Sequence, residues 1–232
     1  NPQAGKPEGP HESLRFAIAP ARLPEWAMRP APEEETPPRP LAPSRGDPDT
    51  PASCSPLKAP GGRVGDGGKA IRRGLLVHDL LQTLPDMDPA RRRQAADKFL
   101  ARKVHGLTRA EQAALAGETL TVLEHREFAP IFGAGSRAEV PVSACIDGRV
   151  IAGQIDRLIV TDEAVWIVDY KTGRQVPERA ADTPPAYLRQ MAAYRAVLER
   201  IYPGRAVRCA LLWTDAPALM PLDDESLARW AP

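Results

Sequence analysis

The chain has 232 residues, and its 31 lysines and arginines nearly balance its 30 aspartates and glutamates, leaving a net charge of +1. Overall charge therefore does not indicate a strongly basic nucleic-acid-binding protein. The three cysteines, Cys54, Cys145 and Cys209, form no CxxC pair. This argues against a disulfide framework, a thiolate zinc site and an iron–sulfur cluster, and it fits a reducing cytoplasm. No apolar run of about 18 residues is present, so we expect neither a transmembrane helix nor a membrane partner.

Proline divides the chain, because fifteen of its 26 prolines lie in residues 1–60. Proline lacks an N–H donor and interrupts both helices and strand ladders. We therefore interpret residues 1–67 as a proline-rich linker that could lie along a domain surface, and residues 68–232 as a compact domain. Since the chain begins with Asn1, we also expect it to be a fragment of a longer protein or a processed product.

Three helices are expected in the first part of this domain. The apolar spacing of "AIRRGLLVHDLLQTLP" predicts the first helix, which ends at Pro85 and turns His78 inward. Residues 89–102 form the second. "TRAEQAALAGETLTVLEH" begins with a capping box from Thr108 to Glu111 and predicts the third.

Strands follow. "RAEVPVSACID" alternates as a strand, and its closing "DG" is a hairpin turn. Residues 151–160 and 165–170 are rich in β-branched side chains and predict two more strands. The amphipathic stretch "AYLRQMAAYRAVLERIYPG" then predicts a helix, and "AVRCALLWT" a core strand parallel to the third. We predict an α/β fold with a mixed central sheet flanked by helices, in the order αβββαβ, with Cys145 and Cys209 in its core.

Two acidic residues face each other in the second hairpin. If Val160 lies opposite Val165, every opposed pair has residue numbers that sum to 325, and Asp156 and Asp169 satisfy that sum. Lys171 lies two residues beyond Asp169, so it shares the same face.

Like charges opposed across a sheet destabilise it, so this arrangement needs compensation. A shared proton, the nearby lysine or a divalent metal ion could each provide it. A structural ion pair at the end of a hairpin is the alternative without any catalytic role.

The ordered motifs "GLLVHDLLQTLP", "GQIDRL", "VDYKTG" and "QMAAY" resemble those of PD-(D/E)XK nucleases, specifically the RecB-like branch. The resemblance covers roughly residues 68–222 and implies a restriction-endonuclease-like core. The residues that fill the family's pattern are His78, Gly153, Asp156, Asp169, Lys171, Gln190 and Tyr194.

The resemblance implies a role for each residue. Asp156 and Asp169 would bind Mg²⁺, for which Mn²⁺ could substitute, with His78 and the backbone carbonyl of Tyr170 as further ligands. Lys171 would hold the attacking water or a phosphate oxygen and stabilise developing negative charge.

Further residues are expected to contact DNA or support the site. Gln190 and Tyr194 are four residues apart, so they share a helix face that would line the catalytic groove. The resemblance implies that they contact a DNA phosphate or the catalytic lysine. Arg157 and Arg174 flank the motifs and are expected to contact phosphates without reading base sequence. Glu139 begins a strand and could reach the metal through a water molecule.

Within the branch, the chain looks most like the C-terminal nuclease domain of AddA-type helicase–nuclease subunits. That resemblance implies an exonuclease acting at DNA ends or on single strands during double-strand-break repair and recombination, in the bacterial cytoplasm near the nucleoid. Its partners would be a helicase portion of the same polypeptide and an AddB-type subunit. AddB-type subunits carry a four-cysteine iron–sulfur cluster, for which this chain lacks the ligands. The alternative is a catalytically silent DNA-binding or subunit-docking module of the same fold.

Overall fold

The structure is a computed structural model that describes residues 25–30, 41–43, 66–173 and 176–232. The chain divides into two units, residues 1–37 and 38–232. The described part of the first unit contains one 3₁₀ turn, Glu25–Met28. None of the described helices combines the length and low polarity needed to cross a bilayer.

A five-stranded mixed sheet forms the centre of the second unit, with the strands in the order β1-β2-β3-β4-β5. Only β3 and β4 are parallel among its neighbouring pairs. The predicted α/β fold and its αβββαβ order are therefore confirmed, and β5 is an additional edge strand that was not predicted. The strands are β1 (Ser136–Ile146), β2 (Arg149–Val160), β3 (Ala164–Lys171), β4 (Ala206–Trp213) and β5 (Ala218–Leu222).

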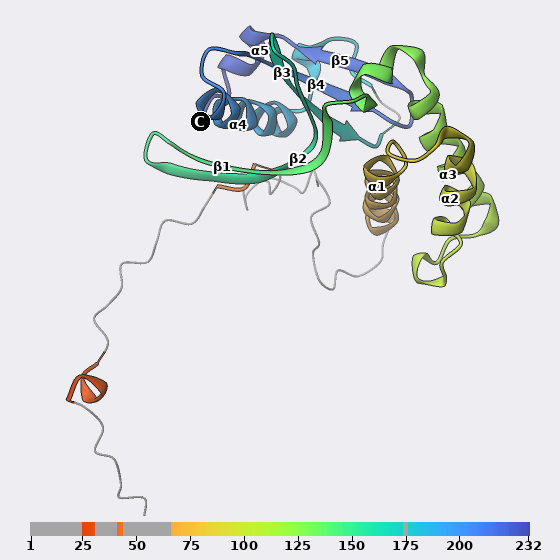
Figure 1. The fold of residues 1–232 in the computed structure, drawn as a ribbon, viewed down its shortest axis with the longest axis horizontal. Coiled ribbons are helices and arrows are strands. Elements are labelled where there is room, and N and C mark those ends of the chain that lie inside the picture. The colour runs from red at the N-terminus through yellow and green to blue at the C-terminus, as the bar shows by residue number, and fades with distance from the viewer. Residues whose placement is uncertain (1–24, 31–40, 44–65, 174–175) are drawn as a thin grey trace, which may run out of the picture. The chain divides into compact units, whose positions relative to one another are not determined.

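Helices cover both faces of the sheet (Figure 1). They are α1 (Asp66–Thr83), α2 (Pro89–Leu100), α3 (Arg109–Glu124), α4 (Pro185–Ile201) and α5 (Asp224–Ala228). The first three helices pack on one face, around the buried Val168 and Leu212 of β3 and β4. The last two pack on the other face, around Ile167 and Leu211. Each face of the sheet therefore packs against its helices in a separate apolar core.

The local sequence signals act as expected. The side chain of Thr108 accepts a hydrogen bond from the Glu111 N–H at the start of α3, and the Glu111 carboxylate accepts one from the Thr108 N–H, which completes the capping box. Asp147 and Gly148 both have positive φ in the β1–β2 turn, as a two-residue hairpin requires. Val160 pairs with Val165, so the predicted register of the second hairpin is confirmed.

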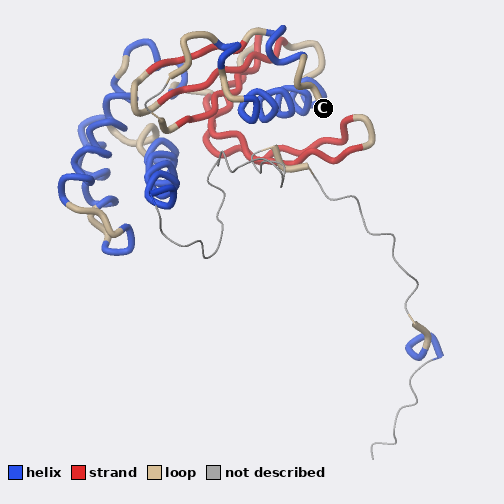
Figure 2. The backbone as a smooth tube through the Cα atoms, turned by 180° about the vertical axis from the view of Figure 1, so that it is seen from behind, coloured by secondary structure: helices blue, strands red, loops and turns tan. Residues whose placement is uncertain are grey.

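The sheet changes direction near Asp156. Ile155 and Leu158 are three residues apart, yet both belong to the core beneath α4, so the alternation of side chains shifts by one between them. Glu139 of β1 lies at the same level and has φ +51°. A left-handed conformation in a strand costs about 1–3 kcal/mol and is kept only where its surroundings impose it. The β1–β2 hairpin consequently curves around α4 (Figure 2).

The curvature leaves part of the β2 edge without a partner in β3, since β2 pairs with β3 only over residues 157–160. Leu41, in the proline-rich part of the chain, forms a parallel bridge with Ile151 on this edge. Its N–H donates to the Val150 carbonyl at 2.8 Å, and its own carbonyl accepts from the Ala152 N–H at 3.0 Å. At least this point of the predicted linker lies against the domain.

The two described cysteines differ. Cys209 is buried, and burial raises the pKa of its thiol to about 12. Cys145 is exposed, so its prediction as a core residue is wrong. It lies on β1, the edge strand of the sheet, where one face of the strand meets solvent.

Candidate active site

Three acidic residues form a row across neighbouring strands. The register of β1 and β2 places Glu139 opposite Asp156, between the pairs Ala138–Arg157 and Val140–Ile155. The register of β2 and β3 places Asp169 opposite Asp156 on the other side, although strand pairing stops one residue earlier. The Asp156 carboxylate accepts a hydrogen bond from the Tyr170 N–H at 2.7 Å at that point. The predicted opposition of the two aspartates therefore places them where β2 and β3 separate.

A histidine completes a group that could hold a metal ion. His78 Nδ1 lies 3.5 Å from Asp156 Oδ1. One ligand atom from each of His78, Glu139 and Asp156 lies within 4.8 Å of the other two. Carboxylate oxygens are the donors that Mg²⁺ and Mn²⁺ prefer, and an imidazole nitrogen suits transition-metal ions. The sequence predicted that Glu139 could reach the metal through a water molecule. In the structure its carboxylate is itself one of the three possible ligands.

The carboxylates of the group favour positive charge nearby. Burial lowers the pKa of His78, but the carboxylates of Asp156, Asp169 and Glu139 outweigh it and raise that pKa to about 9. Burial and the nearby Asp156 raise the pKa of Glu139 to about 7. Burial and repulsion by Asp156 thus favour the protonated form of Glu139, and a divalent cation would relieve that repulsion.

The pKa values of the two buried aspartates are shifted in opposite directions. Burial and the Asp156 charge raise the pKa of Asp169 above its ordinary value, despite Lys171. Burial also acts on Asp156, but its contacts with His78 and with the Tyr170 N–H lower its pKa below the ordinary value. Such separated pairs of carboxyl groups are typical of functional sites.

Lys171 lies inside a small polar network. Its Nζ is 2.6 Å from Asp169 Oδ2 and donates to Gln190 Oε1 at 3.1 Å. Gln190 in turn donates from Nε2 to Asp169 Oδ1 at 2.8 Å. The ring of Tyr187 covers another side of the ammonium, with its centroid 4.0 Å away. Asp169, Lys171 and Gln190 are 5% exposed or less, so α4 closes the site from one side.

Tyr194 supports β2 from within the core. It is fully buried, and its hydroxyl donates to the Gln154 carbonyl at 2.8 Å. A Cβ at Gly153 would lie only 2.7 Å from the Tyr194 ring, so glycine is needed for this close approach. Tyr194 therefore holds the strand that carries Asp156, and its predicted position on a groove surface is wrong.

A second close approach positions α1. A Cβ at Gly74 would lie 3.0 Å from Thr172 Oγ1, directly after β3. The small residue lets the helix lie against the end of the strand that carries Asp169 and Lys171. His78, one turn further along α1, is thereby placed beside Asp156.

The predicted DNA contact at Arg157 is wrong. Its side chain is 1% exposed, packs 5.1 Å from the centroid of the Phe132 ring and donates to the Leu81 carbonyl at 3.4 Å. The shift in alternation near Asp156 turns Arg157 toward α1 and away from solvent. Arg174 lies outside the described residues. The role of the Tyr170 carbonyl as a metal ligand stays a prediction.

The structure adds Tyr187, which the sequence did not single out. It precedes Gln190 by three residues and Tyr194 by seven, so all three share one face of α4. That spacing is visible in the sequence, but the contact with Lys171 depends on how α4 crosses β3.

Residues 59–228 match the family model described as the PD-(D/E)XK nuclease superfamily. The chain belongs to this superfamily. PD-(D/E)XK nucleases use divalent metals, and the group of His78, Glu139 and Asp156 offers the donors that such an ion needs. The five-stranded mixed sheet with flanking helices is the core of this nuclease domain.

The solved structures that match the chain are distant in sequence. A "Putative exonuclease" from Eubacterium rectale has 13% identity and a TM-score of 0.48, and the match covers 68% of this chain and 62% of that protein. The protein SSO0001 has 20% identity and a TM-score of 0.28, with 66% and 71% covered. The protein VC1899 from Vibrio cholerae has 16% identity and a TM-score of 0.29, with 69% and 50% covered. No curated protein sequence matches the chain.

Proposed function

We propose that this PD-(D/E)XK nuclease domain is an exonuclease that hydrolyses DNA phosphodiester bonds with Mg²⁺, at DNA ends or on single strands. One observation carries the proposal: a three-residue group suited to a divalent ion lies beside a buried aspartate–lysine–glutamine network. Neither half alone suggests a reaction. Together they offer both a metal site and a positive charge for the phosphate.

Each side chain has a defined task in this proposal. Asp156, Glu139 and His78 hold the ion, and Asp169 adds its carboxylate from the opposite strand. A bound divalent ion supplies charge neutralisation and activation of water. Lys171 directs its ammonium to the attacking water or to a non-bridging phosphate oxygen, where negative charge develops.

We further propose the biological setting from the RecB-like motifs. The domain would be the nuclease part of an AddA-type helicase–nuclease in double-strand-break repair and recombination, with an AddB-type subunit as its partner. It would act in the bacterial cytoplasm, near the nucleoid. Residues 1–67 would link it to the helicase portion of the same polypeptide. Mn²⁺ would replace Mg²⁺, and no iron–sulfur cluster would be bound.

Digestion of internally labelled DNA tests the proposal. Linear single strands, linear duplexes and covalently closed circular single strands would each be incubated with the domain in Mg²⁺ or in EDTA. We expect linear substrates to be degraded only with Mg²⁺, and circles to persist because they have no end. Asp169→Asn should be inactive, whereas Asp162→Asn, an exposed aspartate in the β2–β3 turn of the same hairpin, should match wild type.

Two outcomes would redirect the proposal. Degradation of circles as well as linear strands would show an endonuclease. DNA binding without any cleavage in Mg²⁺ or Mn²⁺ would instead identify a catalytically silent DNA-binding module.

A further inference from the structure

Tyr187 lies where α4 begins, on the same helix face as Gln190. Its ring is half-buried, and the centroid is 4.0 Å from Lys171 Nζ. The ring also approaches Trp213 of β4, with the ring centroids 6.3 Å apart. Tyr187 therefore contacts both the ammonium of the site and an aromatic side chain of the core.

The surroundings of Lys171 explain why an aromatic face matters here. An ammonium has three N–H donors. Two oxygens are within reach, Asp169 Oδ2 at 2.6 Å and Gln190 Oε1 at 3.1 Å. The ring of Tyr187 offers negative charge density on a third side without accepting a conventional hydrogen bond. Since the lysine side chain is only 6% exposed, little water competes with this contact, and cation–π attraction is strongest when desolvated.

The contact gains importance if the proposed function holds, on which this inference rests. A carboxylate that faces a divalent ion is less available to a neighbouring ammonium. Once Asp169 is engaged in that way, Gln190 and Tyr187 are the described contacts that still restrain Lys171. A ring face restrains the position of the Lys171 ammonium and leaves its N–H donors free for the phosphate or the water.

We propose that Tyr187 is a positioning residue that holds the Lys171 ammonium in its reactive place through its ring face. The hydroxyl has no part in this role. Tyr187→Phe should therefore preserve the role. Tyr187→Leu should lose it, although leucine keeps an apolar side chain against Trp213.

Kinetics of Tyr187→Leu and Tyr187→Phe on linear single-stranded DNA test this role. Removal of a desolvated cation–π contact should lower kcat by about tenfold in Tyr187→Leu and by less than about threefold in Tyr187→Phe. KM and the Mn²⁺ dissociation constant should stay within about twofold of wild type, because none of the proposed metal ligands changes. Tyr202→Leu is the matched control, since Tyr202 follows the other end of α4 and also has a cation over its ring, that of Arg205.

A second readout does not depend on cleavage. In metal-free protein labelled with ¹⁵N-lysine, the ring current should shift one ammonium signal upfield, and Lys171→Arg should identify it by its loss. The shift should persist in Tyr187→Phe and vanish in Tyr187→Leu. If wild type does not cleave DNA, the proposed function fails, and the role that rests on it fails with it, while this shift still reports whether the contact exists.

Three results would overturn the inference. The ammonium signal could be unshifted, which would show that the ring does not cover it. Tyr187→Phe could lose as much kcat as Tyr187→Leu, which would assign the role to the hydroxyl. Tyr187→Leu could lose no more kcat than Tyr202→Leu at equal thermal stability, which would leave Tyr187 as a packing residue.

Discussion

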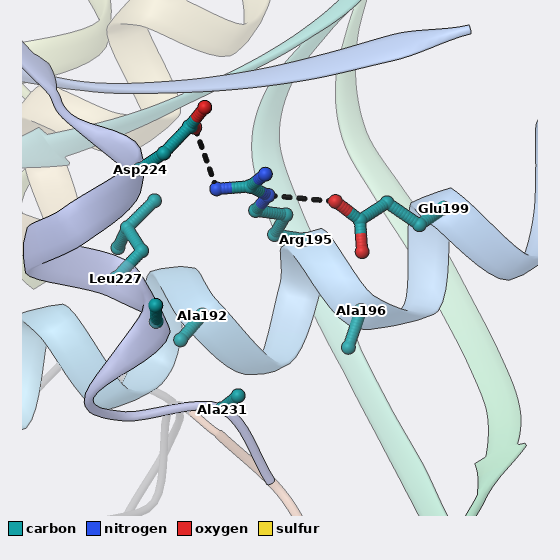
Figure 3. A pocket seen from close by; sticks show the side chains of 8 residues that line it. Ala192, Arg195, Ala196, Glu199, Asp224, Leu227 and Ala231 are labelled. Atoms are coloured by element: carbon teal, nitrogen blue, oxygen red, sulfur yellow. Dashed lines mark hydrogen bonds and ion pairs between the residues drawn. The ribbon is translucent and has the colours of Figure 1, made fainter. Parts of the chain in front are cut away.

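A basic side chain meets carboxylates at nearly the same distance in two regions of this molecule. In the candidate site, Lys171 lies 2.6 Å from Asp169, and their side chains are 6% and 1% exposed. Between α4 and α5, Arg195 lies 2.7 Å from both Glu199 and Asp224, whose side chains are 48% and 87% exposed (Figure 3). The second region borders a pocket of about 280 Å³ partly lined by alanines.

The difference between them is burial, and it decides what each can do. Water screens the Arg195 pairs, and exposed pairs contribute about 0–1 kcal/mol. The Lys171–Asp169 pair is desolvated, so removal of one partner leaves an uncompensated charge that destabilises a protein by about 3–5 kcal/mol. Of these two regions, only the buried one has carboxyl groups whose pKa is raised, first by burial and then by the charge of Asp156. Contact distance alone therefore does not mark a functional site.

Asp169→Asn should show the largest effect. The amide keeps the size of the side chain but removes the charge that faces Lys171 and the proposed metal. We expect cleavage to fall by at least about 10²–10³-fold and the unfolding free energy to fall by about 3 kcal/mol. Cleavage assays and urea denaturation measure the two quantities, with Asp162→Asn as the control. Full activity in Asp169→Asn would remove this residue from the site.

Gln190→Ala should rank second. Gln190 both donates to Asp169 and accepts from Lys171, so its loss leaves two buried partners less well satisfied. Outer contacts of this kind are worth about 10–100-fold in activity or metal affinity. Arg189→Ala, the exposed neighbour on α4, should leave cleavage unchanged. Equal activities of the two variants would show that the polar network is dispensable.

The pH dependence of stability should separate the regions further. The pKa of His78 is raised to about 9 from 6.5, so its contribution to stability is fully present below pH 6.5 and is lost as pH rises through 9. The pKa of Glu139 is raised to about 7, so its contribution to stability is likewise lost as pH rises through 7. The Tm of metal-free protein should therefore fall between pH 6.5 and 8.5, and the Tm increase caused by Mg²⁺ should grow.

The neutral variant His78→Ala is the control for this pH effect. Its Tm should change less over the same range, because the group that exchanges its proton for metal is gone. A wild-type Tm increase with Mg²⁺ that is the same at both pH values would argue against His78 as a ligand.

Arg195→Ala should show the smallest effect. Its two partners are solvent-exposed or half-exposed, so we expect the unfolding free energy to change by no more than about 1 kcal/mol and cleavage to stay at the wild-type rate. Thermal denaturation and the digestion assay measure both. A loss of cleavage would give the region between α4 and α5 a function that its exposure does not indicate.

Parts of this architecture could be predicted from the sequence because they depend on local rules. The hairpin register followed from one turn and from the constant sum of opposed residue numbers, so Asp156 and Asp169 could be paired by number alone. The capping box at Thr108 marked the start of α3, since its hydrogen bonds join residues three positions apart. Such features need no knowledge of the rest of the fold.

Other features depend on long-range geometry. The alternation of β2 shifts near Asp156, which buries Arg157 and brings Glu139 toward His78, and no sequence period reports such a shift. The strand β5 contains Pro221, and a proline weakens a strand prediction except at a sheet edge. Tyr187 reaches Lys171 only because α4 crosses β3 at that level.

The most direct test of the metal site is calorimetric titration with Mn²⁺ of wild type, Asp156→Asn and Asp224→Asn at pH 8. Asp156 belongs to the buried acid row, whereas Asp224 pairs with Arg195 at the surface. We predict that wild type binds Mn²⁺, that Asp156→Asn weakens its affinity by at least about tenfold, and that Asp224→Asn leaves it unchanged. Equal affinity in wild type and Asp156→Asn would contradict the assignment of the acid row as a metal site.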